Sequence, residues 1–271
     1  MATEVEFLGD QVTPRWCREV LRFLPVKSQF ILSGNIRDRY PFLLEVVPPA
    51  EDGEEPPNKY VPLSLTQYVT ETLKLRGYEY FLNYNLVDGF SMIVPRGGDA
   101  EAAKKFCGDK LKLSFDANGF SKCSLAKALE VAERIIEHKD NFVAVFMDFA
   151  SRYLKRVDNP DCGEHEFFTK ALVQCHAAQP HITPERSLAQ FNSVIWLCDK
   201  ENDVPDWLAL NNPRLRPITV PKPDHVVRRA LISQITPSLT DYPDVSSDRR
   251  ADLHDIFIEQ TEGLMLTDVI A

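Results

Sequence analysis

Residues 193–232 read SVIWLCDKENDVPDWLALNNPRLRPITVPKPDHVVRRALI, and this stretch decides the fold class. Val194–Cys198 is an unbroken apolar run, which is typical of a strand that is buried on both faces. Arg216–Val220 is rich in β-branched residues and stops at Pro221, so it predicts a second strand. Asp224 is placed to cap a helix that follows. Strands and helices in this order indicate an α/β domain.

The same kinds of element alternate upstream of this stretch. Apolar or aromatic runs predict three more strands, at Phe30–Leu32, Tyr78–Tyr84 and Phe142–Met147. Apolar residues at helical spacing predict helices at 13–24, 64–76, 124–136 and 163–178, and another from Asp224 onward. Alternation of this kind favours right-handed βαβ units on a parallel sheet that is flanked by helices.

Composition and charge exclude several classes of protein. The 271 residues are 44% hydrophobic and 26% charged, which is ordinary for a globular protein. A net charge of −9 repels phosphate backbones, so no nucleic-acid partner is predicted. The longest apolar run is about six residues, far below the roughly 20 of a membrane span, so no membrane partner is predicted. The six cysteines lack CxxC spacing, which indicates reduced thiols and a cytoplasmic location.

Asp148 directly follows the predicted strand Phe142–Met147. A carboxylate at the carboxyl edge of a parallel strand lies where such sheets bind ligands, and in phosphate-binding NTPases it helps to hold Mg²⁺. The alternative is that Asp148 only begins a loop or caps the next turn.

Residues 140–271 resemble the second half of an AAA+ ATPase core, and residues 28–85 resemble its first half more loosely. The Val194–Cys198 run resembles the strand that bears the sensor-1 polar residue, with Asp199 or Asn202 nearest to that position. The segment 212–216 resembles the one that presents arginine fingers to a neighbouring subunit, here Arg214 and Arg216.

The end of the chain supports the same resemblance. Residues 218–224 resemble the last sheet strand and its exit into a helical lid, and 257–269 (FIEQTEGLMLTDV) resemble a stretch of that lid. The resemblance implies a P-loop NTPase-like core at 28–222 and an incomplete helical lid at 223–271, and the helical spacing after Thr13 predicts an N-terminal helix within 1–27. Within the core, the acidic, proline-rich insertion 48–58 is expected to be a mobile loop, and 88–120 is expected to be irregular apart from a strand at Phe90–Val94.

The first half departs from the AAA+ pattern at the phosphate-binding loop. An active module needs G-x-x-x-x-G-K-[ST] after its first strand, because backbone amides and the lysine neutralise phosphates. Here the sequence after Leu32 is SGNIRDR, with one glycine and no lysine. Arg37 or Arg39 would be the substitute cation, but a guanidinium differs from a lysine in size and donor geometry.

The strand end at Asp148 departs as well. Active relatives usually place a glutamate directly after the magnesium aspartate, whereas this sequence has Phe149. The two departures together predict that this domain does not hydrolyse ATP. The candidate nucleotide-binding residues are therefore Gly34, Asn35, Arg37, Asp148 and Asp199, with ATP and Mg²⁺ bound weakly or not at all.

Two other sets of side chains have competing interpretations. Arg214 and Arg216 are either solvated loop residues or inter-subunit arginines that complete a neighbour's site. Five zinc-type ligands fall within twenty residues, namely Cys162, His165, Cys175, His176 and His181, but their separations are irregular, and His165 and Cys175 would lie about 15 Å apart along one helix. No metal site is predicted.

Three hypotheses for function remain at this point. The first is a degenerate AAA+ module with a structural or regulatory role in an ATP-driven protein-remodelling assembly. Here the resemblance implies an intact ATPase module further along the chain, a homo-oligomer such as a hexamer, and a protein substrate or adaptor. The second is an active ATPase with an atypical loop. The third is an α/β protein-interaction domain unrelated to AAA+.

Overall fold

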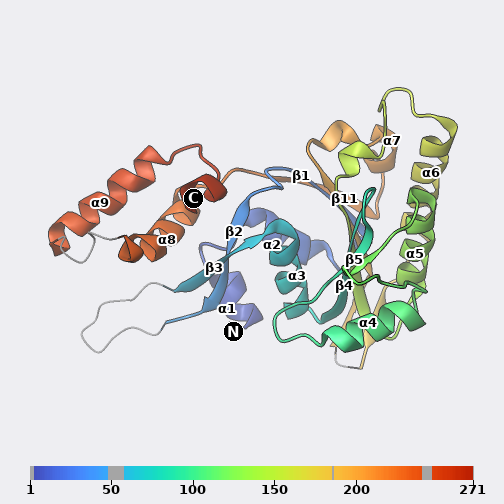
Figure 1. Cartoon of the computed structure of the whole chain (residues 1–271), viewed down its shortest axis with the longest axis horizontal. Helices are drawn as coiled ribbons and strands as arrows, with labels where there is room; N and C mark the ends of the chain where they lie inside the picture. Colours follow the sequence, from blue (N-terminus) through green and yellow to red (C-terminus); the bar gives the residue numbers. More distant parts are fainter. Residues whose placement is uncertain (1–2, 48–57, 185, 240–245, 271) are drawn as a thin grey trace. The chain divides into compact units, whose positions relative to one another are not determined.

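The structure, a computed structural model, describes residues 3–47, 58–184, 186–239 and 246–270 (Figure 1). Its contacts divide the chain into two compact units. The sheet unit consists of residues 19–36 and 70–220, and the hairpin unit of residues 1–18, 37–69 and 221–271. The first and the last segments of the chain therefore belong to the same unit.

The sheet unit is built on a seven-stranded sheet in the order β11-β1-β10-β7-β4-β5-β6. The first five strands of this order are parallel neighbours, whereas β5 and β6 pair in antiparallel fashion. The strand β1 lies between β11 and β10, which is the order that the AAA+ resemblance requires. The predicted α/β core with a mostly parallel sheet is confirmed. The strands are β11 (Leu215–Val220), β1 (Gln29–Gly34), β10 (Ser193–Cys198), β7 (Phe142–Met147), β4 (Tyr78–Asn85), β5 (Gly89–Ile93) and β6 (Phe120–Ser121).

The centre of the sheet forms the main core. Every residue of β7 and β10 is buried, as their unbroken apolar runs predict. The helices α5 (Leu125–Glu137) and α6 (Cys162–Ala177) lie side by side next to the sheet (Figure 1). Ser124 caps α5 as predicted, because its side chain accepts a hydrogen bond from the amide of Lys127. Each apolar side chain buried here contributes about 1.5–3 kcal/mol to folding.

Shorter elements complete the sheet unit. They are α4 (Ala100–Asp109), the 3₁₀ turns η1 (Ala150–Arg152) and η2 (Glu201–Asp203), α7 (Asp206–Ala209), and the two-stranded pair β8 (His181–Thr183) and β9 (Arg186–Gln190). None of the helices among the described residues has the length and apolar character that crossing a membrane requires.

The hairpin unit has its own core. The strands β2 (Arg39–Glu45) and β3 (Lys59–Ser64) form an antiparallel pair, and five aromatic rings pack in a cluster with centroids 5.2–6.1 Å apart. These rings belong to Phe7, Trp16, Tyr40, Phe42 and Tyr68. The helices are α1 (Glu4–Gly9), α8 (His225–Ile235), α9 (Ser247–Gln260) and α10 (Leu266–Ile270), with the 3₁₀ turn η3 (Thr236–Ser238) after α8. The helices α2 (Arg15–Phe23) and α3 (Leu65–Leu75) cross the division between the units.

Three details differ from the sequence prediction. The segment 1–27 contains two helices, α1 and α2, because Thr3 and Glu6 form a separate capping box. The segment 88–120 is not irregular: it holds β5 and also α4, which begins after the N-cap Asp99. Residues 1–18 and 37–69 group with the C-terminal helices instead of with the core. Of the predicted insertion 48–58, residues 48–57 lie outside the described residues.

Candidate functional site

Predicted nucleotide-binding residues lie along one edge of the sheet unit, where the parallel strands end. The strand β1 ends at Gly34, and Asp199 and Asp148 directly follow β10 and β7. Because neighbouring parallel strands have their carboxyl ends at the same edge, these residues share it. The amide of Gly34 donates to the carbonyl oxygen of Asp199 at 3.2 Å. We call this edge the carboxyl edge.

The backbone amides after β1 are used within the protein. In a phosphate-binding loop, successive amides point at the phosphate oxygens. Here the amide of Asn35 donates to the carbonyl of Val220 at 2.8 Å, and that of Ile36 donates to the carbonyl of Gly34 at 2.8 Å. With the bond from Gly34 to Asp199, these consecutive amides all have carbonyl partners.

Gly34 itself is explained by packing at the end of β1. Its φ is +99°, and a Cβ at this position would lie 2.7 Å from the carbonyl oxygen of Val220. The glycine therefore permits a close approach between β1 and β11. This requirement holds with or without a phosphate.

No helix follows β1. The chain passes through Arg37 and Asp38 into β2, so the positive helix N-terminus on which phosphate loops depend is missing here. Arg37 belongs to the hairpin unit and its side chain is exposed. The neighbouring Asp38 is only 2% exposed.

Asp148 is held by its own backbone surroundings. Its side chain is 8% exposed, and its Oδ1 accepts a hydrogen bond from the amide of Phe149 at 2.8 Å. Its amide donates to the carbonyl of Tyr84, and its carbonyl accepts from the hydroxyl of Tyr153. Phe149 has a left-handed backbone with φ 53°, which costs a bulky residue about 1–3 kcal/mol, and its side chain is 47% exposed. An exposed aromatic ring therefore follows the aspartate.

Asp199 is part of a polar network that sequence reasoning missed. Its Oδ2 lies 3.0 Å from Nη2 of Arg152, and its amide donates to the hydroxyl of Ser151 at 2.7 Å. That hydroxyl donates in turn to Asp203 at 2.7 Å. The network joins η1 and η2, the two turns that follow β7 and β10. The segment after each apolar run is polar, but no motif predicted this pairing.

The two predicted inter-subunit arginines have partners within the sheet unit. Arg214 precedes β11, so it lies at the opposite edge of the sheet from Gly34, and its guanidinium is 5.0 Å from the ring centroid of Phe191. Arg216 bonds to Oε1 of Glu19 through Nε at 2.8 Å and Nη2 at 2.5 Å. Its guanidinium also lies 4.9 Å from the ring centroid of Phe23.

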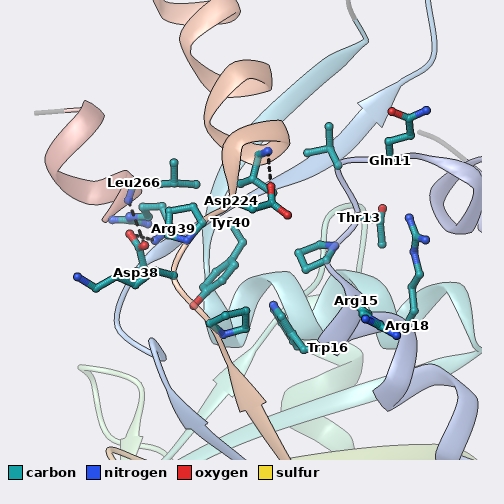
Figure 2. Close-up of a pocket in the computed structure, with 16 residues that line it drawn as sticks. Gln11, Thr13, Arg15, Trp16, Arg18, Asp38, Arg39, Tyr40, Asp224 and Leu266 are labelled. Atoms are coloured by element: carbon teal, nitrogen blue, oxygen red, sulfur yellow. Dashed lines mark hydrogen bonds between the residues drawn. The ribbon is translucent and has the colours of Figure 1, made fainter. Parts of the chain in front are cut away.

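A cavity of about 290 Å³ lies in the hairpin unit (Figure 2). Three segments form its walls: residues 11–18, residues 38–40, and residues 221–227, with Leu266 added from α10. The rings of Trp16 and Tyr40 pack edge to face with centroids 5.4 Å apart, and both are largely buried. Burial, and then the nearby Asp38, raise the pKa of Tyr40 above its ordinary value, so its hydroxyl stays protonated.

Charge in this cavity favours an anion. Arg15, Arg39 and Lys222 are among the residues that form its walls. Its two carboxylates are already used at helix starts: Asp38 accepts from the amide of Leu266 at 3.0 Å, and Asp224 accepts from the amide of Val227 (Figure 2). Arg39, a substitute cation predicted from the sequence, lies in the wall of this cavity, but the sequence does not predict the cavity itself, because its walls come from distant parts of the chain.

A comparison with models of known protein families gives a match. Residues 6–221 match a protein family described as AAA+ chaperone, N-terminal Rossmann-like domain. The match covers most of the chain, and it agrees with the strand order around β1. The hypothesis of a domain unrelated to AAA+ is therefore wrong. A search of curated proteins finds no match.

Proposed function

This chain belongs to the family of N-terminal Rossmann-like domains of AAA+ chaperones, and from that premise we propose that it is a degenerate module that does not hydrolyse ATP. Its role is structural or regulatory, within a larger ATP-driven assembly that remodels proteins. The cytoplasmic location predicted from the sequence is part of the same proposal.

The hydrogen bonds of the backbone after β1 carry this proposal. The amides of Gly34, Asn35 and Ile36 all donate to carbonyl oxygens of the chain, and no helix begins after them. To bind a triphosphate in the usual way, the loop would have to break these bonds. The loop has neither a lysine nor a helix N-terminus that would interact with the phosphates and compensate for the broken bonds.

The carboxyl edge supports the same proposal. Hydrolysis needs a base or a polar residue that orients the attacking water. The residue after Asp148 is Phe149, and Asp199, which follows the neighbouring strand β10, is paired with Arg152. A water at this edge therefore has no obvious carboxylate partner in the position that active relatives use.

The proposal includes partners. An intact ATPase module further along the same polypeptide would supply hydrolysis, and a ring of copies, such as a hexamer, would place Arg214 and Arg216 near a neighbouring subunit. Arg216 would have to leave Glu19 to reach a neighbour's nucleotide, whereas the guanidinium of Arg214 lies over the ring of Phe191 and forms no ion pair among the described residues. Arg214 is therefore the better finger of the two.

Phosphate release by the purified chain with Mg·ATP tests the central claim. We expect no release above the buffer rate, with the Asp148→Asn variant indistinguishable from the unmodified chain. Turnover that disappears in Asp148→Asn would instead establish the active ATPase with an atypical loop.

The cavity in the hairpin unit supports a second candidate function, which is nucleotide binding without hydrolysis. Its aromatic walls and its cations suit a ring with attached phosphates. Isothermal calorimetry with ADP separates this function from binding at the predicted loop. We expect Arg39→Ala to weaken binding about tenfold, since Arg39 forms part of the cavity wall.

Arg37→Ala is the matched control for that experiment. Arg37 is exposed, two residues away along the chain, and not among the residues that line the cavity. Equal losses in both variants, or a loss confined to Arg37→Ala, would place the nucleotide outside the cavity. Absence of heat at millimolar ADP would remove the second candidate and leave the first unaffected.

A further inference from the structure

The paired helices α5 and α6 leave a groove along their length on the sheet unit. Two hollows of about 310 Å³ and 230 Å³ open between these helices. Leu129 and Phe167 contribute to the first hollow, and Ile136 and Gln174 to the second. Gln174 crosses the groove, because its Nε2 donates to the carbonyl of Leu129 at 3.0 Å. The side-chain bridge marks the boundary between the two hollows.

The spacing of the hollows matches one face of a helix. Leu129 and Ile136 are seven positions apart on α5, and Phe167 and Gln174 are seven apart on α6. Seven residues of α-helix span about 10 Å. A helix that lies along the groove presents its residues i and i+7 at this same spacing, on one face.

The floor of the groove is apolar. Leu129, Phe167 and Ile136 are only 3–6% exposed, so they are packed from below and present an edge to the groove. Val173 on the α6 side is 62% exposed. A partner side chain in the second hollow would cover this valine.

Five carboxylates and two lysines line the two hollows, so the charge around the groove is negative. One of the lysines, Lys139, lines the second hollow and donates to the carbonyls of Ile136 and Gln179. Glu133 and Glu137 line the second hollow from α5, and neither forms a hydrogen bond or an ion pair with another residue in the part of the chain that the structure describes. Lys170 lines the first hollow but is paired with Glu166 at 2.6 Å. The bond to Glu166, with smaller contributions from Glu130 and Glu133, raises the pKa of Lys170.

We propose that the groove between α5 and α6 binds an amphipathic helix of a partner protein, with apolar residues at i, i+4 and i+7 and lysine or arginine on the flank that faces Glu133 and Glu137. The apolar residues would fill the two hollows, and the basic flank would neutralise the two carboxylates. Binding here needs no nucleotide, so the inference goes beyond the proposed function and does not depend on it.

Fluorescence anisotropy with a designed helical peptide tests this proposal. The peptide has about sixteen residues, with leucines at i, i+4 and i+7, lysines on one flank and alanines elsewhere. We expect saturable binding to the unmodified chain, and a loss of affinity of about tenfold in Val173→Asp. The double variant Glu133→Gln, Glu137→Gln should bind several-fold more weakly and with less dependence on salt.

Two controls make the result decisive. Ile182→Asp changes a residue on β8 that is 61% exposed, nearly the same as Val173, and that lines neither hollow, so it should bind as the unmodified chain does. A peptide with the same composition but scrambled leucines should bind at least tenfold more weakly. Equal binding of the scrambled peptide, unchanged affinity in Val173→Asp, or no binding to the unmodified chain would each overturn the proposal.

Discussion

The carboxylate of Asp38 accepts two hydrogen bonds from Thr267, one from its amide at 2.9 Å and one from its hydroxyl at 3.1 Å. The same carboxylate accepts from the amides of Leu266 and Arg39. The residue that would belong to a phosphate loop in an active relative is therefore a buried cap on α10. At the sequence position of the phosphate loop, the chain therefore has a buried carboxylate that already accepts hydrogen bonds from the start of α10.

Replacing Asp38 should destabilise the hairpin unit. Asp38→Ala leaves several buried donors without an acceptor, and we expect the free energy of unfolding to fall by about 2–3 kcal/mol in urea denaturation. Asp38→Asn keeps one acceptor oxygen, so its free energy of unfolding should fall by less. Asp99→Ala removes an exposed helix cap on α4 and should cost only about 1 kcal/mol. If Asp38→Ala and Asp99→Ala lowered the free energy of unfolding equally, burial of the Asp38 carboxylate would not be what makes it stabilising.

The centre of the sheet could be predicted from the sequence because the signal is local. Phe142–Met147 is apolar at every position, and these six residues are the strand β7 with the predicted bounds. Ser124 precedes an apolar stripe, and it caps α5 as this position predicts. The hairpin β2–β3 carried no such signal. Pro41 lies opposite Pro62 in this hairpin, and proline usually indicates that a segment is not a strand.

The sites were harder to predict, because their partners are distant in sequence. Nothing near Asp38 indicates a contact with Leu266, which is 228 positions away. The missing lysine after Gly34 was visible, but the carbonyl partners of the amides there, Asp199 and Val220, depend on the strand order. The loss of a motif can thus be predicted from the sequence, whereas the contacts that take its place can be identified only from the structure.

His181 should make stability depend on pH. Burial lowers the pKa of His181 below its ordinary 6.5, and its ring lies 4.6 Å from that of Phe142. The unfolded chain then binds more protons than the folded chain near this pH, so stability is complete above about 6.5 and falls as the pH drops below it. Urea denaturation at several pH values should show a shallower decline in His181→Gln. An unchanged slope in His181→Gln would contradict the assignment.

The thiols should differ strongly in reactivity. Burial raises the pKa of both Cys107 and Cys198 to about 12, while Cys162 is exposed at the start of α6. A thiolate is the reactive species, so a disulfide reagent near neutral pH should label Cys162 first and the two buried thiols only in denaturant. Mass spectrometry of labelled peptides gives the order. Rapid labelling of Cys198 in the folded chain would show that the carboxyl end of β10 opens readily.

The contact between Arg216 and Glu19 should be measurable by a double-mutant cycle. The pair is partly exposed, with side chains 43% and 31% exposed, so we expect a coupling energy of about 0.5–1 kcal/mol. Arg216→Ala should lower the free energy of unfolding more than Glu19→Ala does, because it also removes the contact with the ring of Phe23. A coupling energy near zero would mean that Arg216 is available to other partners at little cost, which would favour its role at a subunit interface.

Gly34→Ala distinguishes a packing role for this glycine from a phosphate-binding role. The alanine would have to adopt φ +99° and would bring its Cβ to 2.7 Å from the carbonyl oxygen of Val220. Gly119 has a similar φ of +82° but nothing within 4 Å of an added Cβ, so Gly119→Ala measures the conformational strain alone. In the absence of any nucleotide, we expect the free energy of unfolding to fall by about 1 kcal/mol in Gly119→Ala and by about 2–3 kcal/mol in Gly34→Ala.

The difference in free energy of unfolding between these two variants measures the steric clash of an added Cβ at the close approach of β1 and β11. If it is large without nucleotide, the glycine is required for the fold of the sheet unit, and its presence after β1 says nothing about phosphate binding. If both variants cost the same and Gly34→Ala instead loses affinity for Mg·ATP, the loop after β1 contacts phosphate after all. In that case the amides of Asn35 and Ile36 must exchange their carbonyl partners when nucleotide binds, and the nucleotide would have to be placed at a rearranged loop after β1, while phosphate release would still decide whether this module hydrolyses it.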